Sequence, residues 1–557
     1  MSLRDRALPI GVALVVLLAM AWVGRSLLHG LVMVLYVYPA VLEAALVLLV
    51  GLFLAARLGG GDREGYAEFL RTLNGNPSPR EIAVAAPPRA GRAALVLAVA
   101  VVLAVLIGVL GGAYAQEHVG HSVAIQETDQ LPEIDASRPR VLPQSVAEQY
   151  AANSLQFPRY ELAPGDVAII EGKPYWTFGL APDGAINNLL LSGKGAVVVN
   201  MTTQRKDVSV VEANPKVSFG VGLASDGEGV VSEYRWRLLK GKYLVAYEDP
   251  IVLPTNGGVD MAVPYVTYEH HVRFTPIPVV YTTPTWGGVA VVNEDGTIRH
   301  LSPEAAREAP ELADQRLYPF DLARYYVQSQ RYVNGIVNKW FVHEGELEVA
   351  PLPGSGNDQP FLTMTADRGM QYVVAVEPYG NAQGIYQVYL FDGRTGAIER
   401  YRLSAESALM GPRKAADYVR KANDRTDWDR FQPAEPLPAV IDGTLYWQVR
   451  VVPQDASGIA YTAFVAADSG DVYTFDTDQR IRSFLAGRGG ATPPPSGGGE
   501  DVAYVIKIRA PNGTVINTVT VTRGQTIQIE TPQNGTTGNG TAQTTTVGRP
   551  ATTTAAG

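Results

Sequence analysis

The feature that most constrains this chain is a set of long apolar runs within the first 115 of its 557 residues. Residues 7–24 and 93–115 carry no charge, and residues 31–56 carry one charged side chain, Glu43. A helix needs about 20 residues to cross the hydrocarbon core of a bilayer, and each run is close to that length. The sequence therefore predicts three transmembrane helices, in a membrane anchor formed by residues 1–115.

The placement of arginines predicts the orientation of these helices. Arg4 and Arg6 precede the first run, and the loop at 57–92 carries six arginines. Short loops rich in Lys and Arg stay in the cytoplasm. We therefore expect a multi-pass cell-membrane protein with a cytoplasmic N-terminus, a cytoplasmic loop and an extracytoplasmic region at 116–557.

Three features of the apolar runs suggest roles beyond anchoring. An ionisable group is costly inside a bilayer, so Glu43 is either a functional group or a hydrogen-bonded packing residue. Gly108 and Gly112 form a Gly-x-x-x-Gly motif, which lets another helix approach closely. The Ala-Tyr-Ala sequence ending at Ala115 resembles a signal-peptidase site, so release of the exterior region by cleavage is an open alternative.

Composition and motifs argue against several partners and chemistries. The net charge is −9 and no Lys/Arg-rich run follows residue 115, whereas nucleic-acid binding needs a basic footprint. The absence of cysteine excludes disulfides, thiolate metal sites and a cysteine nucleophile. Residues 343–347, His-Glu-Gly-Glu-Leu, begin like a zinc-protease helix but lack its second histidine, and His118 and His121 lack a nearby third ligand. We therefore predict no nucleic-acid partner, catalytic residue, metal or cofactor.

The exterior region divides by composition into several parts. The predicted parts are a polar stalk at 116–140, a first α+β region at 141–310, further α+β units at 311–402 and 403–485, a Pro/Gly linker at 486–500, a small all-β unit at 501–532 and a disordered Thr-rich tail at 533–557. Four Asn-x-Thr sequons lie in this region, which predicts a glycoprotein. The glycosylation candidates are Asn200, Asn512, Asn534 and Asn539.

An internal repeat is the most informative feature of the folded part. When the chain is shifted by 74 residues, 370–401 aligns with 444–475 without a gap, and Gly396 falls on Gly470. A proline-led helix start precedes each copy. We therefore expect tandem units with one helix on an antiparallel sheet, and turn glycines at positive φ at Gly396 and Gly470.

Aromatic residues recur at equivalent strand positions of these units. Tyr175-Trp176, Tyr372 and Tyr446-Trp447 match one another in the aligned segments. Recurrence in each copy favours core packing over a ligand platform. Core packing explains the aromatic stretch at 318–340 less well, and part of this stretch is a candidate surface for a partner.

The repeated pattern resembles a known domain. A helix, a hairpin and two strands joined by Asp-x-x-(Thr/Ser)-Gly are similar to the PepSY domain, a small α+β module of extracytoplasmic and membrane-anchored prokaryotic proteins. The segments at 389–398 and 463–472 carry the resemblance, which extends over about 141–475. The resemblance implies a non-catalytic module that binds or restrains other proteins.

Two classes of function follow. The first is a non-catalytic membrane-anchored surface protein whose exterior units bind or scaffold other envelope proteins, or further copies of the chain, with membrane lipid as a second partner. The alternative is a membrane-bound extracytoplasmic enzyme with a site assembled from dispersed residues. Perturbed carboxylates in a deep pocket would favour the enzyme. The expected fold is three transmembrane α-helices, an α+β region of repeated helix-plus-antiparallel-sheet units and a small all-β C-terminal unit.

Overall fold

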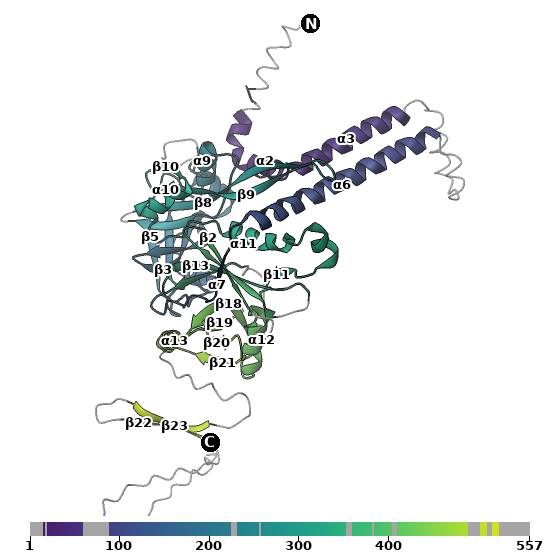
Figure 1. Cartoon of the computed structure of the whole chain (residues 1–557). Coiled ribbons are helices and arrows are strands. Elements are labelled where there is room, and N and C mark those ends of the chain that lie inside the picture. The colour runs from purple at the N-terminus through teal and green to yellow at the C-terminus, as the bar shows by residue number, and fades with distance from the viewer. Residues whose placement is uncertain are drawn as a thin grey trace, which may run out of the picture. The chain divides into compact units, whose positions relative to one another are not determined.

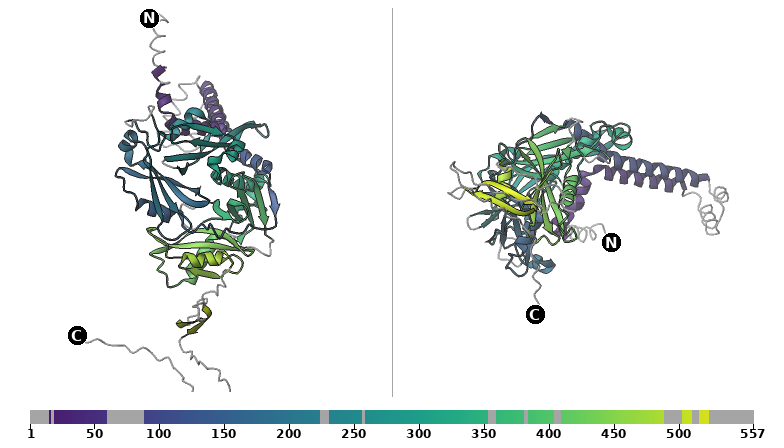
Figure 2. Two further views of the ribbon diagram at one scale, coloured as in Figure 1. Left: turned by 90° about the vertical axis from the view of Figure 1, so that its left-hand side faces the viewer. Right: turned by 90° about the horizontal axis from the view of Figure 1, so that it is seen from below.

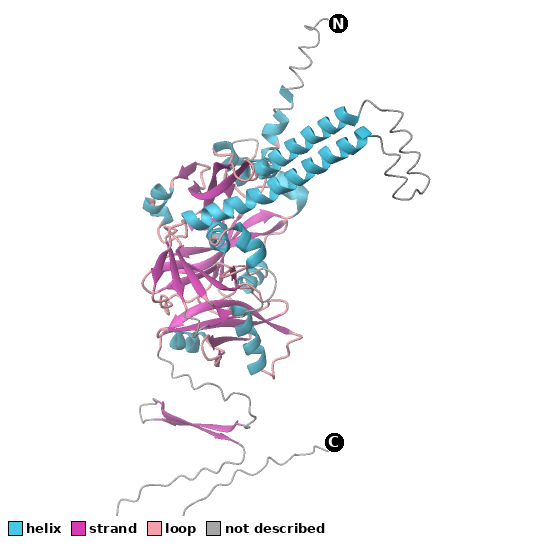
Figure 3. Ribbon diagram, turned by 45° about the vertical axis from the view of Figure 1, so that its right-hand side comes forward, coloured by secondary structure: helices cyan, strands magenta, loops and turns pink. Residues whose placement is uncertain are grey.

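The computed structural model has an α+β fold with several antiparallel sheets (Figure 3). It separates into two compact units, Met1–Thr492 and Pro493–Gly557. The residues that it describes are 15–16, 19–59, 88–223, 231–255, 258–352, 359–380, 384–403, 409–487, 502–509 and 515–522.

In the described N-terminal part of the first unit lie the helices α2 (Arg25–Val37), α3 (Pro39–Gly59) and α6 (Pro88–Ser122). Helices α3 and α6 run side by side (Figures 1 and 2). Both are long and apolar enough to cross a membrane, over Pro39–Leu58 and Arg92–Ser122. The outward-facing leucines and valines of these helices are largely exposed, as expected for helices that cross a bilayer.

The prediction of one continuous helix over 31–56 is wrong. Helix α2 ends at Val37, and α3 begins at Pro39. Proline has no N–H to continue a helical ladder, and it disfavours helical backbone in the residue before it, here Tyr38. Most of the first apolar run, 7–24, lies outside the described residues.

The expected stalk at 116–140 is instead part of the folded body. Helix α6 continues to Ser122, and strand β1 (Gln126–Thr128) pairs in parallel with β16 (Ile398–Arg402). The polar residues of this segment find charged partners: Glu117 bonds Arg273, and Glu127 bonds Arg400 and Arg402. Composition alone shows that such residues are polar, but not that they pair within the fold.

Three segments of the body each consist of a helix followed by a four-stranded antiparallel arrangement. The first has α7 (Gln144–Ala152), β2 (Tyr160–Ile170), β3 (Lys173–Pro182), β4 (Gly195–Asn200) and β5 (Val208–Glu212). The second has α11 (Phe320–Ser329), β12 (Phe361–Thr365), β13 (Gly369–Pro378), β15 (Gln387–Asp392) and β16, with β11 (Leu347–Val349) at the edge. The third has α12 (Pro412–Ala422), β18 (Phe431–Ile441), β19 (Thr444–Pro453), β20 (Tyr461–Ala466) and β21 (Val472–Phe475).

Proline and apolar spacing explain the helices of these segments. Pro412 is the first residue of α12, while Pro143 and Pro319 lie one residue before α7 and α11. In α12 the residues Ala415, Ala416 and Val419 are buried, which is the apolar stripe of an amphipathic helix. Each helix thereby covers one face of its sheet.

A long hairpin forms a further sheet, which shares the expected 141–310 region with the first segment. Strands β8 (Gly258–Arg273) and β9 (Val279–Val292) pair along their length. The sheet also contains β6 (Ala246–Tyr247), β7 (Ile251–Thr255) and β10 (Ile298–Leu301). The remaining elements of the first unit are α8 (Gly184–Leu190), α9 (Tyr234–Gly241), α10 (Pro303–Glu308), η1 (Pro310–Leu312), η2 (Gln330–Tyr332), η3 (Asn338–Val342), β14 (Gly384–Ile385), β17 (Leu409–Met410) and α13 (Asp478–Leu485).

Aromatic side chains fill the core between these sheets. Trp176, Tyr318 and Tyr372 belong to one buried cluster, and Trp447 is at the centre of another. Trp447 and Tyr372 have no exposed surface, which agrees with the core interpretation of the recurring aromatics. In the second compact unit, β22 (Val502–Arg509) and β23 (Val515–Thr522) form an antiparallel hairpin where a small β unit is predicted.

Candidate functional site

The N-terminal helices dock on the β8–β9 hairpin, and we call this contact the junction. The Tyr114 hydroxyl of α6 donates a hydrogen bond to the Thr275 carbonyl oxygen at 3.0 Å, and the Thr282 hydroxyl donates to the Val37 carbonyl oxygen at 2.5 Å. Glu43 lies near the start of α3, where its carboxylate accepts a hydrogen bond from the Val280 N–H at 3.0 Å. Glu43 therefore ties a membrane-type helix to a strand of the body.

The close approach of α3 and α6 uses glycines other than the predicted pair. A Cβ added to Gly111 would lie 2.5 Å from the Ala40 Cβ, and one added to Gly51 would lie 2.3 Å from the Ala100 Cβ. A Cβ on Gly108 or Gly112 would meet no atom within 4 Å. Among the described residues, no helix therefore packs closely against Gly108 or Gly112, where the sequence predicts a helix-packing motif.

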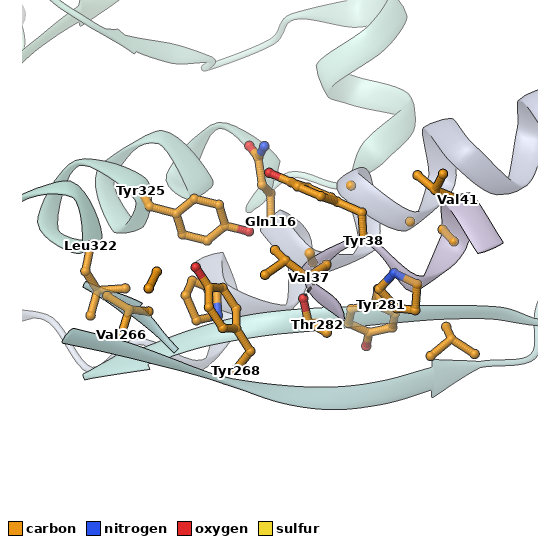
Figure 4. Close-up of a pocket in the computed structure, with 18 of the residues that line it drawn as sticks. Val37, Tyr38, Val41, Gln116, Val266, Tyr268, Tyr281, Thr282, Leu322 and Tyr325 are labelled. Atoms are coloured by element: carbon orange, nitrogen blue, oxygen red, sulfur yellow. Dashed lines mark hydrogen bonds between the residues drawn. The ribbon is translucent and has the colours of Figure 1, made fainter. Parts of the chain in front are cut away.

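Gly108 and Gly112 instead line a cavity of about 430 Å³ at the junction, which we call the junction cavity. Its walls come from the start of α3, the end of the apolar part of α6, the β8–β9 hairpin and α11. Figure 4 shows the hydroxyl ends of Tyr38, Tyr268 and Tyr325 near one another, beside Gln116. Cavities of roughly 300–1,000 Å³ hold small ligands.

Burial keeps Tyr268 and Tyr325 of the junction cavity protonated. It raises the pKa of Tyr268 to about 12 and raises the pKa of Tyr325 further above its usual value. Among the described residues, no side chain or backbone group makes a hydrogen bond to the hydroxyl of Tyr38, Tyr268 or Tyr325. The cavity therefore presents three hydroxyls that are free to donate or accept hydrogen bonds.

A second cavity of about 440 Å³, the polar cavity, lies between the three helix-plus-sheet segments. Tyr247, Glu248 and Asp321 line both cavities, so these side chains form the wall between them. Five carboxylates and two guanidinium groups line the polar cavity. They belong to Asp166, Glu248, Asp249, Asp321, Glu435, Arg140 and Arg316.

Two buried ion networks occupy most of these charges. Arg316 bonds Asp166 and donates to Glu248 Oε2 at 3.2 Å, while Glu248 Oε1 accepts from the Asp321 N–H at 3.0 Å. Burial raises the pKa of Glu248, and Arg316 opposes this rise. The network thus holds one segment against the next, because Asp166 and Arg316 belong to different segments.

The second network is centred on Glu435. Its Oε2 accepts hydrogen bonds from Arg140 Nη2 at 2.9 Å and from Arg450 Nη2 at 2.6 Å, and its Oε1 accepts from the Gln144 N–H at 2.9 Å. Burial lowers the pKa of Arg450 to about 10, so the guanidinium stays charged at neutral pH. The three partners of Glu435 join the start of α7 to the sheet of the third segment.

The junction contains a pair of histidines that the sequence did not predict. The rings of His118 and His271 are 4.3 Å apart, and His271 Nε2 is 2.8 Å from the Thr283 hydroxyl. Burial, and then the neighbouring His118, lower the pKa of His271 below its usual value of 6.5. His121 does not join this pair, because its ring bonds the Glu117 carbonyl oxygen on its own helix.

We expect the junction to weaken in acid. Because the folded pKa of His271 is lowered, its contribution to stability is present above the unfolded value of about 6.5 and is lost as the pH falls through the folded value. The melting temperature of the full chain should fall from pH 7 to pH 5, and His271→Gln should reduce that fall. His121→Gln, on the exposed side of α6, is the control. Equal pH dependence in His271→Gln and the wild type would contradict this role.

The other residues that the sequence singled out either make ion pairs and hydrogen bonds within the fold or lie outside the described residues. Among the described residues no cluster of three or more His, Asp or Glu side chains has the arrangement of a metal site. His343 Nδ1 lies 2.6 Å from Glu346, which also bonds Arg331 and Lys339. The Asn200 amide donates to Asp207 at 2.9 Å. Asn512, Asn534 and Asn539 lie outside the described residues.

The turn glycines have the left-handed backbone that the repeat predicts. Gly396 has φ 71° and Gly470 has φ 81°. Each lies beneath a tyrosine: an added Cβ would be 2.3 Å from Tyr318 in the first case and 2.4 Å from Tyr418 in the second. The absence of a side chain is therefore required both by backbone conformation and by packing.

One apolar surface of the body is uncovered. Helix α8 has no buried residue, and its large apolar side chains Ile186, Leu189 and Leu190 are 75, 48 and 43 % exposed. Exposed apolar patches on soluble surfaces mark interaction sites. Sequence periodicity could not find this patch, because seven residues are too few to show which face of a helix is buried.

Sequence reasoning also missed the tyrosines of the junction cavity and the Glu435 network. Tyr38, Tyr268 and Tyr325 lie in separate elements, and only the aromatic richness of 318–340 pointed to one of them. Glu435 and Arg140 are 295 residues apart in the sequence. Comparison with protein-family models, with curated proteins and with solved structures finds no match to this chain.

Proposed function

We propose that the chain is a membrane-anchored extracytoplasmic protein whose exterior units bind other proteins without catalysing a reaction. In this proposal residues 7–24, α3 and α6 cross the membrane, and the N-terminus and the arginine-rich loop at 57–92 lie in the cytoplasm. The start of α3 and the end of α6 both contact β9, which supports a body held at one end of the helix pair, opposite the loop.

Exposed apolar side chains beside these helix ends support the membrane placement. Leu27 and Leu31 on α2, Phe274 at the tip of the β8–β9 hairpin, and Val337 and Phe341 in or next to η3 are 63 to 89 % exposed. Nearby side chains of the hairpin and of η3 pack on α6 in one cluster. Apolar residues at the surface of a bilayer are stabilised by contact with lipid.

We infer that the helix-plus-sheet segments are copies of a PepSY-like unit. Adding 74 to the cross-strand pair Phe391 and Ile398 gives Val465 and Val472, which also pair. The central strands differ by one residue in register, since Tyr372 pairs with Phe391 whereas Tyr446 pairs with Ala466. The shared turn register supports a duplication, and the central shift is a local change within it.

The proposal that the chain binds another protein rests on the uncovered apolar face of α8. Ile186, Leu189 and Leu190 lie in the first segment, and in the described part of the chain no other element covers them. A surface of this kind is stabilised when a partner removes it from water. The partner is a second copy of the chain or another envelope protein.

A membrane-bound enzyme is the alternative, and the polar cavity favours it. Burial raises the pKa of Glu248 there, as in many general acids. Both Glu248 oxygens are, however, occupied by Arg316 and by the Asp321 N–H, and Asp166 and Glu435 are bonded to arginines. These carboxylates hold the segments together, which supports binding over catalysis.

Single-cysteine labelling tests topology and partner together, because the chain has no cysteine of its own. Intact cells that express Ile186→Cys are treated with a sulfonated, membrane-impermeant maleimide that carries a benzophenone, and are then irradiated. We expect labelling at 186, no labelling of Gly75→Cys, and a cross-linked adduct to a second polypeptide. The adduct mass distinguishes a second copy from another protein.

Lys173→Cys is the matched control, because Lys173 is an exposed residue of the same segment. It should be labelled but should not give the adduct. Labelling of Gly75→Cys in intact cells would contradict the proposed topology. Equal cross-linking from positions 173 and 186 would contradict the role of α8.

A further inference from the structure

The junction cavity differs from the other cavities in where its walls come from. One wall consists of Gly108, Gly112 and Ala115 on α6, and another of Pro39 and its neighbours at the start of α3. Both helices are long and apolar enough to cross a membrane. If they do so as proposed above, the cavity lies at the outer surface of the bilayer, beside the lipid headgroups and the first carbons of their chains.

The glycines of α6 create the apolar part of this cavity. Since a Cβ at Gly108 or Gly112 would meet no atom within 4 Å, larger residues there would extend into open space. Val37, Val266 and Leu322 add larger apolar side chains to the lining. This part of the cavity suits a hydrocarbon chain, which gains free energy by leaving water and packing against apolar side chains.

The polar part of the cavity selects against negative charge. The hydroxyls of Tyr38, Tyr268 and Tyr325 have no hydrogen-bond partner among the described residues, and burial raises the pKa of Tyr268 and of Tyr325. Asp321 and Glu248 line the same cavity, and none of the described residues that line it is a Lys or an Arg. Glu248 is paired with Arg316, so the Asp321 carboxylate is the charge that a phosphate would meet there. A hydroxyl group, in contrast, can donate to the Asp321 carboxylate and bond to the tyrosines.

We propose that the junction cavity binds one lipid from the surrounding bilayer, with its apolar chain against α6 and an uncharged, hydroxyl-bearing headgroup among Tyr38, Tyr268 and Tyr325. The site rests on the membrane placement proposed above, and it adds a specific lipid to that function. Bound lipid would fill the space between the helices and the body and would fix the junction in one arrangement.

The test compares two lipids that differ by one phosphate. The full chain is reconstituted in phosphatidylcholine nanodiscs with either monooleoylglycerol or its anionic counterpart, oleoyl lysophosphatidic acid. Native mass spectrometry then counts the lipids that each released chain retains. We expect one retained monooleoylglycerol per chain and at least about tenfold less retention of the phosphate-bearing lipid, because like charges are opposed in the cavity.

Two variants locate the site. Gly112→Leu should fill the cavity and abolish retention, and it should fold because the added side chain enters open space on a helix. Tyr325→Phe removes one hydroxyl and should reduce retention severalfold. Val109→Leu is the matched control on the same helix, since Val109 is 52 % exposed and does not line the cavity.

Three outcomes would overturn the proposal. They are no retained monooleoylglycerol in the wild type, equal retention of the two lipids, and full retention by Gly112→Leu. The cysteine labelling described above is read separately. Correct labelling without lipid retention would reject the lipid site alone, whereas labelling at position 75 would reject the membrane placement beneath it.

Discussion

Replacing Glu435 by glutamine is expected to destabilise the body by about 3–5 kcal/mol, because it leaves two buried guanidinium groups without a carboxylate. Arg450 has no exposed side-chain surface, and Glu435 has 2 %. Among the described residues, Glu435 is the carboxylate that pairs with each of Arg140 and Arg450, and the Nε atoms of both arginines have no hydrogen-bond partner. Thermal unfolding of the full chain should show a loss of about 4–6 °C.

Two further variants separate charge from packing. Asp417→Asn removes an exposed ion pair with Arg420, and exposed pairs contribute at most about 1 kcal/mol. The double variant Glu435→Met, Arg450→Met replaces the buried pair with apolar side chains and should recover part of the lost stability. A melting temperature of Glu435→Gln within 1 °C of the wild type, with normal folding, would show that the network does not hold the segments together.

Valine at the turn glycines is expected to have the second large effect. Gly443 lies in the turn between β18 and β19, with φ 74°. Gly443→Val introduces only backbone strain, about 1–2 kcal/mol, because an added Cβ meets no atom within 4 Å. Gly470→Val adds a clash with Tyr418, which is half-buried and can shift. Gly396→Val adds a clash with Tyr318, which is 4 % exposed in the core. Overpacking of a core costs a further ~1–3 kcal/mol.

Destabilisation is therefore expected to be smallest for Gly443→Val, larger for Gly470→Val and largest for Gly396→Val. Chemical denaturation of the full chain in detergent gives the three midpoints. The order is specific to the contacts described, since backbone strain alone would make the three variants alike. Equal midpoints for all three would mean that neither Tyr318 nor Tyr418 resists the added side chain.

Short-range patterns in the sequence account for much of the architecture. The apolar runs predict helices of membrane-spanning length, and two such helices lie among the residues that the structure describes. Alternating strands and the Asp-x-x-(Thr/Ser)-Gly turns predict antiparallel hairpins, and Gly396 and Gly470 have the positive φ that such turns need. These features depend on neighbouring residues, so the sequence contains the information directly.

The sequence by itself thus determined the α+β class, the apolar N-terminal helices and the tight turns, because steric limits and periodicity act within a few residues. Only the tertiary structure decided that the polar segment at 116–140 joins the folded body, which groups bond Glu435, and that Gly108 and Gly112 line a cavity. Each of these depends on which distant elements meet. Docking of one segment on another follows from shape and charge summed over many side chains, and no local pattern records it.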